Sequence, residues 1–498
     1  MSYVDFLLHA LLWDGVGGRA KWLPFNKNKN SSRETVARIV TSGEYKMRIA
    51  KSRKELLLCG VFLSANLGLI ESATADGAFE SQSPWMLGDW GGARSDLQEK
   101  GYTIDASYIS ELAFNAHGGY DKNGKLAYVD QFAFGVAMDL QKILSIPNAR
   151  FQVMISNRNG DNLTGERLTD PRSGPVTSTM EVYGRGQVWR LNQMFYQQSW
   201  LDNKLDLKVG RMSPSDDFQS FPCDFQNVAF CGAQAGMWVG DDWYAYPIGQ
   251  WGTRFKVAVA PELFFQAGVY EHNRTLRQNN NGFKLSTSGA NGVILPVELL
   301  WTPSKALFDL PGEYRVGAYR MNINADDKFE DVNGQPKALT GAEAKNRDRR
   351  SGVWAMARQQ VAQFDGNANR SVEVFAQAHA NDRHTSFVDR FYSAGIVVTG
   401  PFAARPGDQV AFAVGKAHVN EKIRDNQRLL NGLAGATNYD DPNFTPEQSS
   451  EYMAELYYGM KATNWLTLRP NIQYLHNPGA VREVEDAVVT GLKIIAVF

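Results

Sequence analysis

Along most of this chain, apolar residues recur at every second position in segments of about ten residues. In the segment that starts at Tyr102, apolar side chains stand at Ile104, Ala106 and Tyr108, and mostly polar ones stand between them. A period of two is that of a β-strand with one apolar face and one polar face. The chain is therefore expected to fold mainly into two-faced strands.

The number of these segments and the lengths of their connections indicate a barrel. Short connections alternate with mostly long, polar ones, so all the long loops fall on one side, as in outer-membrane barrels. The polar face carries ionisable groups that suit a water-filled lumen. We predict an all-β fold, a transmembrane antiparallel β-barrel of 16 strands in which the segment ending at Phe498 pairs with the one starting near Tyr102. The predicted strands are 102–115, 126–140, 149–158, 186–198, 204–212, 250–260, 262–271, 292–302, 313–322, 352–362, 370–380, 389–400, 408–419, 450–461, 464–475 and 487–498.

Composition excludes several other classes of protein. Aromatic residues make up 12% of the chain and hydrophobic residues 43%, which rules out a disordered chain. The mean hydropathy is −0.35, and no apolar run is long enough for a spanning helix. The net charge of −1 gives no basic surface for a nucleic-acid partner. These values do not exclude a membrane barrel, because the apolar and polar residues of an alternating strand cancel when hydropathy is averaged.

The N-terminal part divides into three segments before the barrel domain, 101–498. Residues 47–75 have the basic start, apolar stretch and Ala73-Thr74-Ala75 end of a secretory signal peptide, which predicts export to the outer membrane. The alternative is a short amphipathic helix. Residues 1–46 precede that signal and are expected to be an upstream extension outside the fold. Residues 76–100 are expected to form a periplasmic segment with a short helix.

The segment 213–249 is long and rich in Trp and Phe, although its flanking strands need only a short turn. An exposed loop would leave that apolar surface in water, so we expect it to fold into the barrel. The segment also contains Cys223 and Cys231, eight residues apart. In an exported protein these cysteines are expected to form a disulfide, and the alternative is two reduced thiols.

Several motifs together resemble those of the carbohydrate-selective porins of the OprB family. The resemblance covers about Trp85 to Phe498 and implies an outer-membrane channel for the passive diffusion of sugars such as glucose. Two departures are Lys493, where the family often has arginine, and the individual loops at 323–351 and 420–449. The motifs are Leu87-Gly88-Asp89-Trp90-Gly91-Gly92-Ala93-Arg94, Val209-Gly210-Arg211 with Asp216-Asp217-Phe218, the stretch Cys223 to Cys231, Gly268-Val269-Tyr270-Glu271-His272-Asn273, and Arg469 to Gly479.

A sugar channel needs donors and acceptors for hydroxyl groups and an aromatic face for the C–H surface of the ring. Charged residues at the alternate strand positions that face the lumen supply the donors and acceptors. Tryptophans of 213–249 supply the aromatic face. For each charge, the alternative is a solvated wall residue that only keeps the lumen wet. The candidate constriction residues are Glu111, Arg158, Arg254, Lys256, Trp238 and Trp243.

Two further classes of function stay open beside the sugar channel. Basic wall residues would also serve a general or anion-selective porin. An enzyme or adhesin built on a barrel is disfavoured, because no nucleophile and base pair emerges from the sequence and no Gly-x-Ser-x-Gly motif occurs. We expect no catalytic residue, cofactor or metal, and as partners carbohydrates and outer-membrane lipid. The sequence does not decide between a monomer and a trimer.

Overall fold

The computed structural model describes residues 77–238 and 242–498. The predicted extension 1–46 and signal peptide 47–75 lie outside the described residues. The described part of the predicted periplasmic segment contains a short turn, η1 (Trp90–Gly92), and a helix, α2 (Ala93–Glu99). Gly92 permits the left-handed turn before α2, since its φ is 96°.

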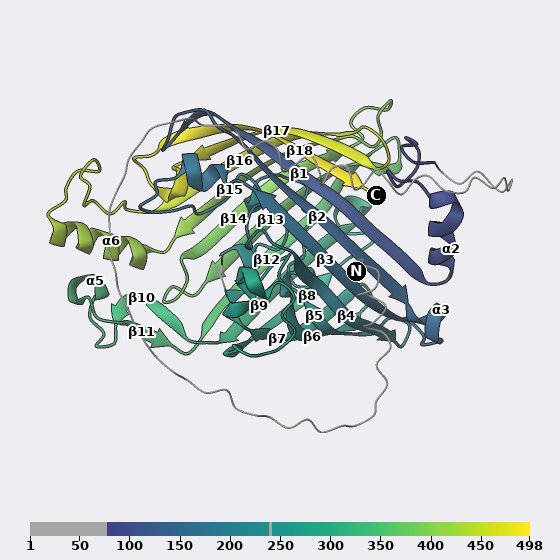
Figure 1. Cartoon of the computed structure of the whole chain (residues 1–498), viewed down its shortest axis with the longest axis horizontal. Helices are drawn as coiled ribbons and strands as arrows, with labels where there is room; N and C mark the ends of the chain where they lie inside the picture. Colours follow the sequence, from purple (N-terminus) through teal and green to yellow (C-terminus); the bar gives the residue numbers. More distant parts are fainter. Residues whose placement is uncertain (1–76, 239–241) are drawn as a thin grey trace, which may run out of the picture. The chain divides into compact units, whose positions relative to one another are not determined.

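The described residues form a closed antiparallel barrel of sixteen strands, which confirms the predicted fold class (Figure 1). Each strand pairs with its neighbours in chain order, except that β9 pairs with β12 across an inserted two-stranded hairpin. The barrel strands are β1 (Tyr102–Gly119), β2 (Leu126–Asp139), β3 (Ala149–Gly160), β4 (Arg190–Trp200), β5 (Leu205–Met212), β6 (Gln250–Ala260), β7 (Leu263–His272), β8 (Gly292–Trp301), β9 (Gly312–Asn322), β12 (Arg350–Phe364), β13 (Asn367–Asn381), β14 (Val388–Thr399), β15 (Gln409–Val419), β16 (Ser450–Lys461), β17 (Leu466–His476) and β18 (Glu485–Val497).

The barrel closes where the last strand meets the first, as predicted. In this seam, Ser107 of β1 lies opposite Val497 of β18, and Glu111 lies opposite Lys493. Arg94 of α2 is buried beside the seam, and its Nη1 donates to the carbonyl oxygen of Phe498 at 2.7 Å. The N-terminal helix therefore fastens the two ends of the barrel sheet.

The two ends of the barrel differ in their connections (Figure 1). Helices α2 and α3 (Leu140–Leu144) lie at the end with mostly short turns, which we call the turn end. The opposite end, the loop end, carries α5, α6 and the hairpin β10–β11. These elements are β10 (Ala325–Asp331), β11 (Ala344–Arg347), α5 (Lys337–Thr340) and α6 (Glu421–Ala434). In the described part of the chain, no helix is long and apolar enough to cross a membrane.

The two faces of the strands separate as the alternation predicts. Side chains such as Phe255, Val316 and Ile472 are exposed on the outer face, Val316 by 62%. Arg254 and Arg315, one position away from two of these residues, are buried on the inner face. An apolar exterior with a polar interior is the arrangement that a lipid bilayer requires of a barrel.

The lumen is narrower than the strands alone predict, because part of it is packed with side chains. Trp243 from the connection between β5 and β6 lies against the inward-facing Tyr319 and Trp354, with ring centroids 5.5 and 6.1 Å away. These residues belong to an apolar cluster with Phe218 and Tyr270. The prediction that the inner face lines a water-filled lumen is therefore wrong beside β7–β12, where the wall and the inserted segment form a packed apolar core.

Candidate channel constriction

The described residues of the segment 213–249, which are 213–238 and 242–249, fold into the barrel, as expected, and buried carboxylates of the wall hold the backbone of this segment. Glu298 of β8 accepts from the backbone N–H of Gln219 at 2.8 Å. Glu455 of β16 accepts from the N–H groups of Gln226 and Asn227 at 2.9 and 2.7 Å. These hydrogen bonds are buried and join the backbone of the segment to two strands of the wall, so they fix the path of the segment through the lumen.

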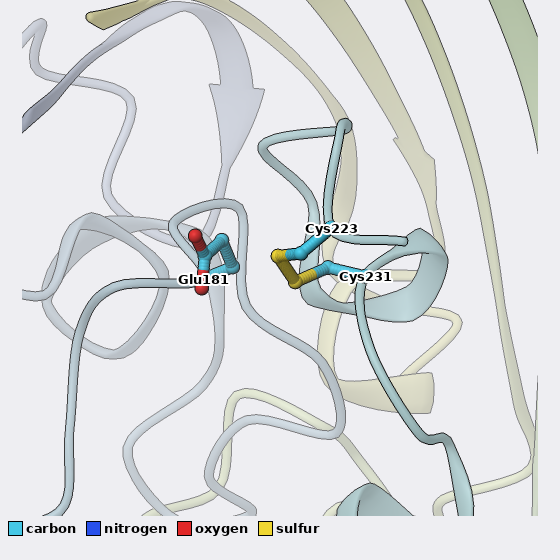
Figure 2. A group of neighbouring side chains, drawn as sticks. All are labelled: Glu181, Cys223 and Cys231. Atoms are coloured by element: carbon cyan, nitrogen blue, oxygen red, sulfur yellow. A yellow bond between two sulfur atoms is a disulfide. The ribbon is translucent and has the colours of Figure 1, made fainter. Parts of the chain in front are cut away.

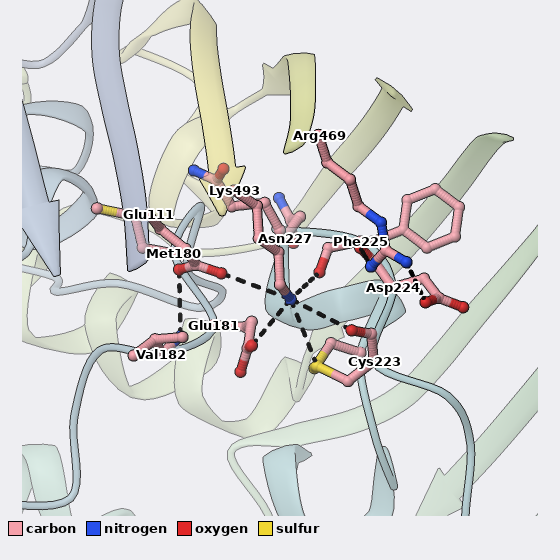
Figure 3. A network of polar contacts seen from close by, with 12 residues as sticks. Glu111, Met180, Glu181, Val182, Cys223, Asp224, Phe225, Asn227, Arg469 and Lys493 are labelled. Atoms are coloured by element: carbon pink, nitrogen blue, oxygen red, sulfur yellow. Dashed lines mark hydrogen bonds and ion pairs between the residues drawn. A yellow bond between two sulfur atoms is a disulfide. The ribbon is translucent and has the colours of Figure 1, made fainter. Parts of the chain in front are cut away.

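Lys493 is the central contact between the seam and the inserted chain (Figure 3). Its Nζ donates to Glu181 Oε1 at 2.9 Å and to the carbonyl oxygens of Cys223 and Phe225 at 3.2 and 3.0 Å. Glu111 Oε1 lies 3.6 Å from the same nitrogen, and both side chains are buried. One buried cation thus ties β1, β18 and two loop segments together.

A second connection, 161–189, also enters the lumen, which the sequence analysis missed. Glu111 accepts from the backbone N–H of Val182 at 3.2 Å, and Gln473 of β17 donates to the carbonyl oxygen of Thr179 at 3.0 Å. Met180 and Val182 are fully buried. The sequence could have predicted this, because apolar side chains in an otherwise polar connection indicate burial. The same kind of evidence predicted that 213–249 folds into the barrel.

Three cavities follow one another along the lumen. The outer cavity, about 400 Å³ near the loop end, shares Val176 and Trp238 with a central cavity of about 510 Å³. The central cavity shares Phe221 with an inner cavity of about 110 Å³, which extends toward Thr399 and Gln409 near the turn end. Because successive cavities share lining residues, they mark a path along the lumen, and the cavity beyond Phe221 toward the turn end is the smallest of the three.

The central cavity is lined by charges of both signs and by aromatic rings. Arg158 on β3 has its guanidinium 5.7 Å from the ring of Tyr246 and donates from Nε to Gln131 at 2.8 Å. Burial lowers the pKa of Arg185 in the lining loop to about 10 and raises the pKa of Asp216. The full charged and aromatic set is Arg158, Glu181, Tyr183, Arg185, Asp216, Phe221, Trp238 and Tyr246.

Of the predicted constriction residues, the structure brings Arg158 and Trp238 to the same cavity. Trp238 is held by stacking on Phe391 of β14, with ring centroids 4.6 Å apart, and it also lines the outer cavity. The guanidinium of Arg158 on β3 and the indole of Trp238 in the segment 213–249 therefore line the same central cavity.

The other four candidates lie away from the central cavity. Glu111 is on the inner face, as expected, but it is covered by 161–189 and holds that segment. Arg254 is ion-paired with Asp206 and lies 3.4 Å from Asp217, while Lys256 lies over the ring of Phe264 at 5.3 Å. Glu111, Arg254 and Lys256 lie on the inner face of their strands, as the alternation predicted.

Trp243 is fully buried in the apolar cluster, and its indole Nε1 donates to Ser215 Oγ at 2.8 Å. Its surroundings are those of a packing residue and differ from the sugar contact that the sequence suggested. The ring packs against Tyr319 of β9 and Trp354 of β12, so the ring that was expected to meet solute meets protein instead.

Cys223 and Cys231 are joined by a disulfide, with Cα atoms 4.1 Å apart (Figure 2). Glu181 lies beside the disulfide, and one of its carboxylate oxygens is within 4.8 Å of both sulfur atoms, close enough to suggest a metal site. A disulfide offers no thiolate ligand, so this arrangement does not fit a metal ion. The bridge instead closes the part of 213–249 that lines the central cavity.

The arrangement of the central cavity suits polyols. A guanidinium donates hydrogen bonds to adjacent hydroxyl groups, a carboxylate accepts them, and an aromatic ring offers a face to C–H groups. Neither a strong excess of one charge nor a nucleophile is needed for that task. The geometry supports binding and passage of a solute.

Comparison with known proteins gives the family. The model of the OprB family of carbohydrate-selective porins matches residues 123–498. Porin B of Pseudomonas aeruginosa is 48% identical over 438 residues, which cover 88% of this chain and 96% of that protein. The putative porin QuiX of Acinetobacter baylyi is 38% identical over 441 residues, which cover 86% of this chain and 98% of that protein.

Among solved structures, the high-pH structure of OprB from Pseudomonas putida superimposes with a TM-score of 0.83 at 48% sequence identity. The match covers 85% of this chain and 100% of that chain. The relatives are channels and not enzymes, and their fold is that of bacterial outer-membrane proteins. This chain belongs to the OprB family of carbohydrate-selective porins.

Proposed function

We propose that this outer-membrane carbohydrate channel passes small neutral sugars of the size of glucose, and that the central cavity selects them. The supporting observation is the meeting of Arg158 and Glu181 with the rings of Trp238 and Tyr246 around one space. A sugar crossing this space would exchange water for these donors, acceptors and rings.

Arg158 is the residue on which this proposal depends most directly. Its Nε is engaged by Gln131, which fixes the plane of the guanidinium at the cavity wall. The Nη groups would then donate to two neighbouring hydroxyls of a sugar, while Glu181 accepts from another. Trp238 and Tyr246 would cover the apolar face of the ring.

Replacing Arg158 with alanine is expected to weaken sugar binding by about 1 to 3 kcal/mol, because a charged donor inside the cavity is lost. Permeability to cations should rise at the same time, since a positive charge leaves the wall. Liposome swelling with glucose, compared with a neutral solute of equal size, measures the first effect, and reversal potentials measure the second.

Arg150 provides the matched control for that experiment. It lies on the same strand and the same face as Arg158, but it is exposed near the turn end and does not line the central cavity. Arg150→Ala should leave the ratio of the two swelling rates unchanged. If Arg158→Ala changes both solutes equally, the arginine only keeps the wall wet and the assignment is wrong.

We also infer that residues 47–75 direct export and that the mature chain starts near Asp76. The basic, apolar and small-residue parts of this stretch support the inference. Mass spectrometry of the N-terminal peptide of the protein isolated from outer membranes is expected to find a start close to Asp76. A peptide from within 1–46 in the membrane-inserted protein would contradict both assignments.

A further inference from the structure

The outer cavity differs from the central one in its charge. Four of the described residues that line it are basic, and only one is acidic. The basic residues are Arg274 and Arg277 after β7, Lys328 on β10 and Arg350 at the start of β12, and the acidic one is Asp242. A neutral sugar gains no favourable interaction from an excess of positive charge. The described lining of this cavity therefore favours a negatively charged ligand.

Asp242 is already engaged by its neighbours. Its Oδ1 lies 2.8 Å from both Arg274 Nε and His272 Nε2, and its Oδ2 accepts from Arg350 Nη1 at 2.5 Å. The carboxylate is almost completely buried and thus serves to hold these side chains in place. Its negative charge also acts on Lys328, but it makes no ion pair with that lysine and does not outweigh the effects of burial and of the neighbouring cations.

Lys328 is the cation that most clearly needs a partner. No carboxylate of the described residues lies within ion-pair distance of its Nζ, and no described group accepts a hydrogen bond from it. Burial, followed by the charges of Arg350 and Lys337, lowers its pKa, although the charges of Asp326 and Asp242 act in the opposite direction. An anion in the cavity would relieve both the desolvation and the repulsion.

The rest of the described lining of the outer cavity is mostly apolar. It includes Val176, Met237, Trp238, Phe387 and Val388, and Thr385 adds a hydroxyl-bearing side chain beside them. A ligand that fits must therefore carry a negative charge at one end and a carbon skeleton that can lie on an indole and a phenyl ring. The volume of about 400 Å³ lies in the range of small-molecule sites.

We propose that the outer cavity binds polyhydroxylated carboxylates, that is, sugar acids, with the carboxylate at Lys328 and the carbon chain against Trp238. This goes beyond passage of neutral sugars through the central cavity. Because the two cavities share Val176 and Trp238, a sugar acid bound here stands at the entrance to the path described above.

Single-channel recordings in planar bilayers test the proposal with sodium gluconate as the probe and glucose as the neutral reference. With the wild-type channel, gluconate added on the side of the loop end should interrupt the current more often than glucose at equal concentration. The difference should shrink as the salt concentration rises. Lys328→Gln is expected to lower the gluconate association rate by about fivefold or more and to leave the glucose rate within about twofold.

Two variants control for indirect effects. Lys328→Arg keeps the charge and should retain gluconate binding. Lys345→Gln removes a lysine from the same hairpin, where it pairs with Glu330 at 3.0 Å outside the cavity, and should change neither rate. Equal gluconate rates in wild type and Lys328→Gln, or an equal loss in Lys345→Gln, would overturn the proposal.

Two further outcomes would decide the class of ligand and the standing of the proposed function. If glucose 6-phosphate interrupts the current more strongly than gluconate and with the same dependence on Lys328, the ligand class is phosphate esters and the carboxylate assignment is wrong. If gluconate interrupts the wild-type current in a Lys328-dependent way and glucose does not, the outer site stands and the proposed selection of neutral sugars fails.

Discussion

Replacing Lys493 with methionine is expected to lower the free energy of unfolding by about 3 to 5 kcal/mol, because buried carboxylates lose their counter-charge. Glu111 and Glu181 both lie within 4 Å of the lysine Nζ, and Glu111 is fully buried. The carbonyl groups of Cys223 and Phe225 would lose their donor as well. The inserted segments should then detach from the seam, so single-channel conductance should rise and discrimination between sugars should fall.

Urea titration of the detergent-solubilised barrel, followed by tryptophan fluorescence, measures the loss of stability. Lys416→Met is the matched control, since Lys416 lies over the ring of Tyr452 at 5.1 Å on the outer face and holds no loop. The control should stay close to wild type, and Lys493→Arg should recover part of the loss. A Lys493→Met protein with wild-type stability and conductance would show that the segments are held by packing alone.

Replacing Asp242 with asparagine is expected to cost about 3 kcal/mol, because Arg350 and His272 remain buried beside a neutral side chain. Urea titrations at several pH values test the electrostatic origin. The neighbouring cations and hydrogen bonds hold the pKa of Asp242 well below its ordinary value, against the effect of burial. The stabilisation is therefore fully present above the unfolded-state pKa of about 3.9 and is lost only as the pH falls below it toward the folded-state pKa.

The difference in stability between wild type and Asp242→Asn should thus stay constant from pH 7 to about 4 and shrink at lower pH. Asp161→Asn serves as the control, since the side chain of Asp161 is 61% exposed and its nearest basic group, Lys125, is 4.0 Å away. It should have almost no effect. A gap that already closes near pH 6 would mean that a group other than Asp242 carries the pH dependence.

The barrel could be predicted from the sequence because each strand carries its own evidence. Phe255 and Arg254 differ in environment for a local reason, the alternation of a strand between two faces, and no long-range information is needed to see it. The inserted segment 213–249 was also predictable, since its aromatic residues would be stranded outside the barrel. The inward direction of Glu111 and Arg158 follows from the same alternation along a strand.

The position of a side chain along the lumen could not be predicted in this way. Whether an inward residue meets water or protein depends on which loop covers it, and the loops meet the wall through contacts between residues far apart in the chain. Glu111 illustrates this, since Val182, 71 positions away, lies over it. Trp243 is buried for a similar reason, because Tyr319 and Trp354 reach it from strands that alternation alone does not place opposite it.

The fastening of the seam by α2 has a consequence for biosynthesis. Arg94 donates to the backbone carbonyl oxygen of Phe498, 404 residues away, and the backbone N–H of Phe498 donates to the carbonyl oxygen of Ala106. The contacts that complete the barrel therefore cannot form until β18 has been synthesised. Until then β1 and β18 have unpaired edges, which are templates for aggregation, and so distant a pairing is slow to form without help. A nascent chain of this protein therefore depends on being kept apart from other chains until β18 has been made and has paired with β1.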